Sequence, residues 1–295
     1  MFGVNFSAAF HAPVRPHGAA SVAGPRPLAL LASGSRHGRI TRLITPWDIG
    51  ELTTPFVFLG YAEVAPESQP LCGIQPDSSI AALTVVLDGG VTFEDSAGGH
   101  GEVRAGGFAW MKAAHAVWRG GGCASGEPLR LFQLWISLPP SQPRSAAMSE
   151  GIAAQEVEEE GPARVILGQL GRARSPLRTA PADINCLHVS LKDRERWRYA
   201  APDGHNVTWL AVDRGGLQLR EGERVCWEQV AVFGDSGGVI EAQADGDTSF
   251  VLGSARRHPR SLAQGESLFP ASLVAPIRPA AEREQVAPRL RAQSR

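Results

Sequence analysis

The chain has 295 residues, with 29 lysines and arginines, 30 aspartates and glutamates and a formal net charge of −1. This length suits one large or two medium domains, and the balanced charge excludes a strongly basic surface that would mark nucleic acid as the partner. The 33 glycines and 22 prolines, with aromatic residues at only 7%, favour many short strands joined by turns.

Residues 1–36 contain no acidic residue and are rich in alanine, proline, glycine and serine. A transit peptide has a similar composition, but the prolines would interrupt an amphipathic helix, so we expect a disordered tail over residues 1–36. Ordered sequence is expected from His37. Apolar and polar residues alternate over 40–44, which predicts a half-buried strand, and the apolar run 55–60 predicts a buried strand.

The next segment predicts a β-hairpin. β-Branched residues favour strands over 83–87 and 91–95, and Asp88-Gly89-Gly90 between them supplies the positive φ that a tight turn requires. Further strands over 108–111 and 129–136 complete a first all-β unit.

The second half of the chain repeats the first in outline. Residues 139–162 contain prolines, small residues and the acidic run 156–160, which predict a linker with a solvated charged face. Strands are predicted beyond it over 208–219, 229–233 and 249–253, roughly 124 positions after their counterparts. Two related β units predict a tandem β-barrel.

Residues 75–121 carry a family resemblance. They begin with Gln75-Pro76-Asp77 and end with Ala116-Val117-Trp118-Arg119-Gly120-Gly121. Together with stretches such as 38–43, 55–59 and 131–140, this pattern resembles the pirin family of iron-containing bicupins. The resemblance implies an all-β fold of two tandem cupin (jelly-roll) β-barrels. The implied organisation is a tail 1–36, an N-terminal cupin domain 37–140, a linker 141–162, a C-terminal cupin domain 163–275 and a C-terminal tail 276–295.

The chain departs from the family at the metal ligands. Pirins place His-Pro-His and His-x-Glu (or His-x-Gly) where this sequence has Gln75, Asp77, Arg119 and Gly121. A cupin iron site requires imidazoles, and a guanidinium offers only donors, so we expect no cofactor and no catalytic residue. These four residues are the predicted pocket, with His115 and Trp118 at its rim.

Three states of this pocket remain open. Asp77 and Arg119 pair as ions where the metal would lie, or Arg119 holds an anionic ligand, or the cavity has no ligand. The expected function is binding or regulatory, with an anionic or aromatic small molecule or a regulatory protein as partner, and without nucleic acid or membrane. The alternative is a metal-dependent quercetin 2,3-dioxygenase.

Four widely spaced cysteines (Cys72, Cys123, Cys186 and Cys226) form no C-x-x-C motif. We expect free thiols in a reducing compartment, and therefore a cytoplasmic protein.

A serine protease is the remaining rival. Gly234-Asp235-Ser236-Gly237-Gly238 matches a nucleophile motif, with His115 and Asp183 as the remaining triad members. The spacing between these residues is unlike that of chymotrypsin-like enzymes, and we expect 234–238 to be a glycine turn between strands.

Overall fold

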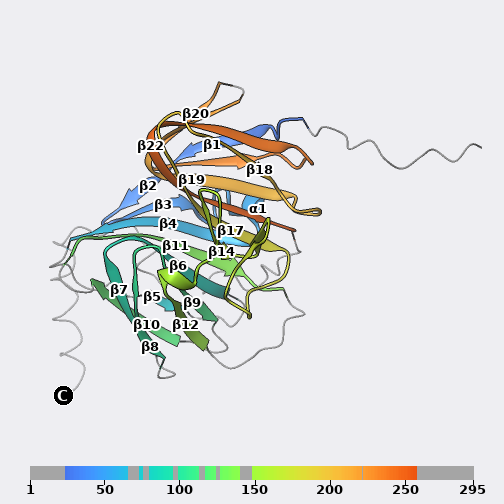
Figure 1. Ribbon diagram of the computed structural model, residues 1–295. Coiled ribbons are helices and arrows are strands. Elements are labelled where there is room, and N and C mark those ends of the chain that lie inside the picture. Colours follow the sequence, from blue (N-terminus) through green and yellow to red (C-terminus); the bar gives the residue numbers. More distant parts are fainter. Residues whose placement is uncertain are drawn as a thin grey trace, which may run out of the picture.

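The computed structural model describes residues 24–65, 73–75, 80–95, 99–112, 117–123, 127–139, 148–220 and 222–257; over 73–75, 94–95 and 117–123 it describes the backbone and its pairing. These residues form two adjoining β-rich halves (Figure 1). The strands of the N-terminal half are β2 (Ser35–His37), β3 (Ile40–Ile44), β4 (Phe56–Val64), β5 (Gly73–Gln75), β6 (Ile80–Asp88), β7 (Gly90–Asp95), β8 (His100–Arg104), β9 (Phe108–Lys112), β10 (Val117–Cys123), β11 (Leu129–Ser137) and β12 (Met148–Ile152).

The strands of the C-terminal half are β1 (Leu28–Ser33), β13 (Glu159–Glu160), β14 (Ala163–Leu167), β15 (Gln169–Leu170), β16 (Ala173–Arg174), β17 (Ile184–Leu191), β18 (Arg196–Ala200), β19 (Val207–Leu219), β20 (Arg224–Cys226), β21 (Gln229–Phe233) and β22 (Val239–Ala255). The helical segments of the described residues are the single turn α1 (Gly50–Thr53) and the 3-10 turn η2 (Ala154–Glu156). Neither is long and apolar enough to cross a membrane.

The N-terminal half is a sandwich of two antiparallel sheets. Its described strands form a seven-stranded sheet in the order β12-β9-β6-β11-β4-β3-β2 and a four-stranded sheet in the order β5-β10-β7-β8. Val91 and Phe93 of the small sheet pack against Leu131 of the large one in a shared core. The predicted strand over 40–44 is confirmed at β3.

The hairpin expected around Asp88-Gly89-Gly90 is wrong in its pairing. β6 pairs with β9 and β11, whereas β7 pairs with β8 and β10, so the turn carries the chain from one sheet to the other. Gly89 does adopt a positive φ of 69°. However, β6 is buried along both faces from Ile80 to Val86, and such a strand takes its partners from inside a covered sheet. The turn residues therefore predict the bend but not the partner strand.

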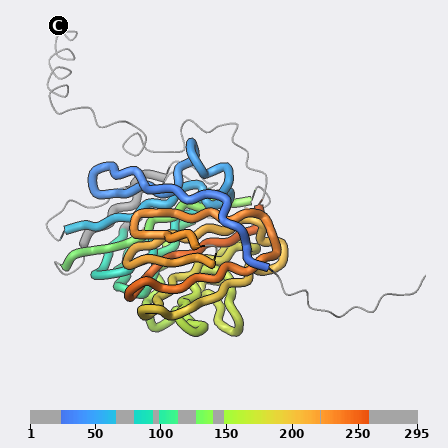
Figure 2. The backbone as a smooth tube through the Cα atoms, turned by 90° about the horizontal axis from the view of Figure 1, so that it is seen from above, coloured from blue at the N-terminus to red at the C-terminus, as the bar shows by residue number. Residues whose placement is uncertain are grey.

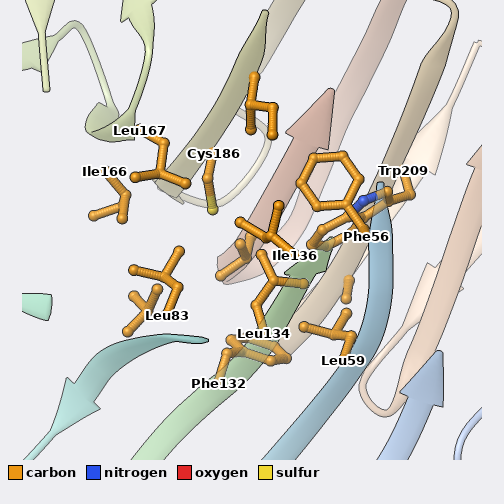
Figure 3. Packing of buried hydrophobic residues seen from close by; sticks show 14 of the residues in the cluster. Phe56, Leu59, Leu83, Phe132, Leu134, Ile136, Ile166, Leu167, Cys186 and Trp209 are labelled. Carbon is orange, nitrogen blue, oxygen red and sulfur yellow. The ribbon is translucent and has the colours of Figure 1, made fainter. Parts of the chain in front are cut away.

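The second face of the seven-stranded sheet packs against the C-terminal half. Figure 3 shows this cluster, in which Phe56 and Trp209 meet edge to face with ring centroids 5.3 Å apart. The members labelled there are Phe56, Leu59, Leu83, Phe132, Leu134, Ile136, Ile166, Leu167, Cys186 and Trp209. Burial on both faces explains the unbroken apolar run 55–60, and the buried strand predicted there is confirmed at β4.

The C-terminal half is built around one curved sheet. Its described strands run in the order β1-β21-β19-β22-β17-β14-β13, with β18 and β20 paired at the sides of β22 and β19. β22 pairs with β18 near its beginning and with β17 near its end, so the sheet wraps a core that contains Tyr199, Leu210 and Phe250. The strands predicted over 208–219 and 229–233 are confirmed at β19 and β21. The one predicted over 249–253 is the end of the longer β22.

The tail expected over residues 1–36 needs correction at its end. Leu28–Ser33 forms β1, which pairs antiparallel with β21 at the edge of the C-terminal sheet. Figure 2 shows this blue segment lying along the orange strands. Leu28 and Leu30 pack against buried clusters, and this apolar contact orders the segment despite its flanking prolines. Residues 1–23 and 258–295 lie outside the described part of the chain.

The linker expected over 141–162 also needs correction. Met148–Ile152 forms β12, which pairs with β9 and belongs to the N-terminal sheet. Ile152 is 4% exposed and anchors the strand in the core between the halves. Small alanine residues flank this short strand on both sides, so the sequence shows no clear strand pattern there. The acidic run after it is exposed except at Val157, and Glu159 pairs with Arg164 at 2.7 Å.

Candidate functional site

Backbone pairing brings three of the four predicted pocket residues onto neighbouring strands. β5 runs antiparallel to β10, with Gln75 opposite Val117 and Gly73 opposite Arg119. Arg119 and Gly121 both belong to β10. Asp77 and the predicted rim residue His115 lie outside the described residues.

The register places these three residues on one face of the small sheet. Gly121 lies opposite Phe93 of β7, and directly opposite residues share a face, as do residues two apart on one strand. Gln75, Arg119 and Gly121 therefore occupy the face that carries Phe93. Phe93 is 6% exposed and belongs to the core between the two sheets. Trp118, at the alternate position of β10, lies on the opposite face.

The same register gives Arg119 an acidic neighbour that sequence reasoning missed. Asp95 of β7 is the residue directly opposite Arg119. We expected the carboxylate partner at Asp77, close in sequence to Gln75. The alternation of Val91, Phe93 and Asp95 along β7 is the signal that could have identified it, because it assigns Asp95 to the face of Phe93.

The large sheet presents a mixed polar and aromatic wall toward the small sheet. On the face that buries Leu131, the Thr84 hydroxyl donates to the Gln133 carbonyl oxygen at 2.9 Å. One register step further, the rings of Phe58 and Trp135 lie 4.9 Å apart. Gln133 is a polar residue between Leu131 and Trp135 in the alternation of β11, a signal visible in the sequence.

Three of the four residues at the predicted ligand positions are poor ligands for iron by residue type, whereas the carboxylate of Asp77 is able to coordinate a metal. Arg119 has donors only, Gly121 has no side chain, and the amide of Gln75 is a weak ligand. In the part of the chain that the structure describes, no three His, Cys, Asp or Glu side chains gather in a group able to hold a metal ion.

A hollow lies in the C-terminal half. This open cleft of about 600 Å³ is bordered by the β15–β16 hairpin and by the segments around Asp183 and His205. His205 is 8% exposed, and its Nδ1 lies 2.8 Å from the Ser254 hydroxyl. His188 does not border the cleft; its Nε2 lies 2.9 Å from the Ser249 hydroxyl, and burial lowers its pKa to about 4.

The proposed protease residues have other roles in this structure. The Ser236 hydroxyl accepts from the Gly238 N–H at 3.2 Å within a turn, as expected for a glycine turn between strands. Asp183 is exposed and lies 3.9 Å from the Arg256 guanidinium. His115 is outside the described residues.

Comparison with known proteins identifies the family. The Pirin family model matches residues 39–136. A Pseudomonas aeruginosa protein named “Putative quercetin 2,3-dioxygenase” is 30% identical over 205 residues, covering 65% of this chain and 71% of that protein. The chain belongs to the pirin family. A second Pseudomonas aeruginosa protein, also named as a quercetin 2,3-dioxygenase, is 28% identical over 223 residues. This match covers 69% of this chain and 76% of that protein.

Solved structures confirm the pirin fold. A quercetin 2,3-dioxygenase from Acinetobacter baumannii superposes with a TM-score of 0.70 at 22% identity, over 79% of this chain and 88% of that one. The bacterial pirin YhhW from Escherichia coli, solved in complex with nickel(II), gives 0.59 at 19% identity, over 79% and 98% of the chains. The expected all-β bicupin architecture is therefore confirmed, with the described strands leaving each barrel open.

Proposed function

We propose that this pirin is a binding or regulatory protein whose first-barrel pocket works without a metal ion. The observation that carries the proposal is the register of β5, β7 and β10, which assigns Gln75, Arg119 and Gly121 to the face that carries Phe93. An arginine among the former ligand positions opposes a metal cation and favours an anion.

The ligand that suits this pocket is an anionic or aromatic small molecule. The buried wall of Phe58, Trp135 and Met111 is apolar and aromatic, while Thr84 and Gln133 add polar groups on the same sheet. In the free protein, Asp77 or Asp95 is the proposed partner of Arg119. An alternative role in the same class is the binding of a regulatory protein. The free thiols of Cys186 and Cys226 support a reducing, cytoplasmic location.

Metal content and ligand binding test this proposal together. Purified protein is expected to contain far less than stoichiometric iron, and quercetin, as an aromatic probe, is expected to quench tryptophan fluorescence without added metal. Arg119→Gln should weaken the binding of anionic probes such as benzoate. Arg104→Gln, on the exposed strand β8 of the same sheet, is the matched control. Iron near one per chain in the purified protein contradicts the metal-free pocket.

A quercetin 2,3-dioxygenase is the second candidate, and the names of the two Pseudomonas aeruginosa relatives favour it. Oxygen uptake with quercetin, measured with and without added Fe(II), distinguishes the two functions. Iron-dependent turnover that survives Arg119→Gln would establish the enzyme and replace the binding protein.

A further inference from the structure

A directional chain of buried hydrogen bonds runs to the cleft of the C-terminal barrel. It starts at Asn185, which is 4% exposed. The Asn185 carbonyl accepts from the Gln169 backbone N–H at 3.1 Å, and its amide donates to the Gln169 carbonyl at 2.8 Å. This double contact fixes which end of the amide is the donor. The same amide nitrogen donates to the Tyr199 hydroxyl at 3.2 Å.

The rest of the chain follows from satisfying each buried group. Tyr199 is 1% exposed, and its hydroxyl lies 2.7 Å from that of Ser254, which is fully buried. Since Tyr199 accepts from Asn185, its own proton is satisfied only by donation to Ser254. Ser254 then donates to His205 Nδ1, 2.8 Å away. The proton of the neutral imidazole therefore resides on Nε2.

The Nε2–H group of His205 is a donor left for a ligand. It has no hydrogen-bond partner among the described residues and is not one of their fully buried unpaired atoms. His205 borders the cleft, and Arg26 fixes its backbone by donating to the His205 carbonyl at 3.3 Å. Burial lowers the pKa of His205, which keeps the ring neutral near neutral pH.

The cleft offers one guanidinium to an anionic ligand, and the Glu158 carboxylate nearby is held by the Arg174 backbone N–H at 2.8 Å. Arg174 lines the cleft and is exposed, and its guanidinium makes no hydrogen bond or ion pair within the described residues. The carboxylate of Asp183 lies beside Arg256, which balances its charge. Leu170, Pro181 and Pro202 add apolar surface to the same cleft.

We propose that this cleft is a second binding site, for a small organic carboxylate held by the His205 Nε2–H and the Arg174 guanidinium. The site is separate from the first-barrel pocket and does not depend on what that pocket binds. A neutral imidazole N–H and a guanidinium form charge-assisted hydrogen bonds to a carboxylate, and the apolar lining suits an aromatic or branched ligand.

Nuclear magnetic resonance of ¹⁵N-labelled histidine tests the proposal, with benzoate as the probe and benzamide as its neutral analogue. We expect the His205 ring in the Nε2–H tautomer, and a shift of its signals with benzoate but not benzamide. Arg174→Gln should weaken this response on the order of tenfold. Arg172→Gln, an exposed arginine of the same hairpin outside the cleft lining, should not.

Ser254→Ala supplies a second readout, because it removes the donor that fixes the tautomer. The His205 ring should then show the other tautomer or a mixture. The Nδ1–H tautomer in the unsubstituted protein overturns the proposal. So does an absence of any His205 shift at millimolar benzoate, or an equal effect of the two arginine substitutions. Binding of benzoate in the first barrel would leave the His205 signals unchanged.

Discussion

Arg130 of the N-terminal barrel and Asp213 of the C-terminal barrel form an ion pair, with Nη1 and Oδ2 3.2 Å apart. The Asp213 side chain is 1% exposed and that of Arg130 is 15% exposed, and Arg130 also reaches Asp88 at 3.3 Å. Burial raises the pKa of Asp213, and the nearby guanidinium opposes this rise. The pair therefore joins the two barrels at a point where the Asp213 carboxylate is shielded from water.

Substituting one member of this pair should destabilise the protein. Arg130→Met leaves the Asp213 carboxylate buried without its cation, and we expect a loss of about 2–4 kcal/mol in the free energy of unfolding, measured in urea. The double variant Arg130→Met/Asp213→Leu should recover much of the loss. Glu102→Gln, in the exposed pair with Arg104, is the control and should change stability by less than about 1 kcal/mol. Equal effects at both pairs would contradict the bridging role.

The apolar cluster between the two halves, which contains Phe56 and Trp209, predicts a second effect on stability. A Cβ atom at Gly253 would lie 2.5 Å from the ring of Trp209, which is fully buried against Phe56. Gly253→Ala should therefore destabilise the fold by roughly 1–3 kcal/mol through overpacking. Gly237→Ala, where nothing lies within 4 Å, is the control. The unfolding temperatures of both variants are measured by near-ultraviolet circular dichroism. If Gly253→Ala unfolds at the same temperature as the unsubstituted protein, the Trp209 ring does not pack against Gly253.

His188 predicts the acid response of stability. Burial lowers its pKa from 6.5 to about 4. Below pH 6.5 the unfolded chain therefore gains a proton that the folded chain gains only near pH 4. The contribution of His188 to the free energy of unfolding is fully present above pH 6.5. It decreases as the pH falls toward 4, by on the order of 1–3 kcal/mol in total. In the His188→Gln variant, the free energy of unfolding measured in urea should depend less on pH between 6.5 and 4. The control His37→Gln, on the edge strand β2, should leave this pH dependence unchanged.

Restoring the family ligands tests the first-barrel pocket directly. The triple variant Gln75→His/Asp77→His/Arg119→His recreates the family pattern, with Gly121 matching the His-x-Gly form. We expect it to bind Fe(II) at least about 100-fold more tightly than the unsubstituted protein, measured by metal analysis after dialysis. Reverting only Gln75 and Asp77 should give weaker binding, because Arg119 still opposes the cation. Failure of the triple variant would mean that these positions do not converge.

The sequence predicts strands well where local pattern and burial agree. The alternation over 40–44 and the apolar run at 55–60 correspond to β3 and β4, because one strand has one buried face and the other has two. Pairing is harder to predict. Asp88-Gly89-Gly90 has the chemistry of a hairpin turn, yet which strand neighbours β6 depends on contacts with residues some 50 positions away, such as Gln133. The formation of β1 is equally non-local, since this strand pairs with β21, about 200 positions later in the chain.

The candidate sites show the same division. The resemblance to the family predicted a pocket of Gln75, Asp77, Arg119 and Gly121, and the register assigns the three described residues among them to one face. Asp95 was missed because its relation to Arg119 exists only across strands. The cleft beside His205 was not predicted as a site, because it combines residues from three separate segments and a lone histidine on a strand boundary carries no pattern of its own.

The position of β1 has a consequence for how the protein is made. Arg26, just before this strand, hydrogen-bonds to Gly234, 208 positions later in the chain. The segment is synthesised well before its partner strand β21. Until then β1 has no sheet to join, and a fragment that starts after the N-terminal barrel would expose the β21 edge. The C-terminal sheet is therefore completed by a strand that precedes the whole N-terminal barrel in the chain, which links the folding of the two halves.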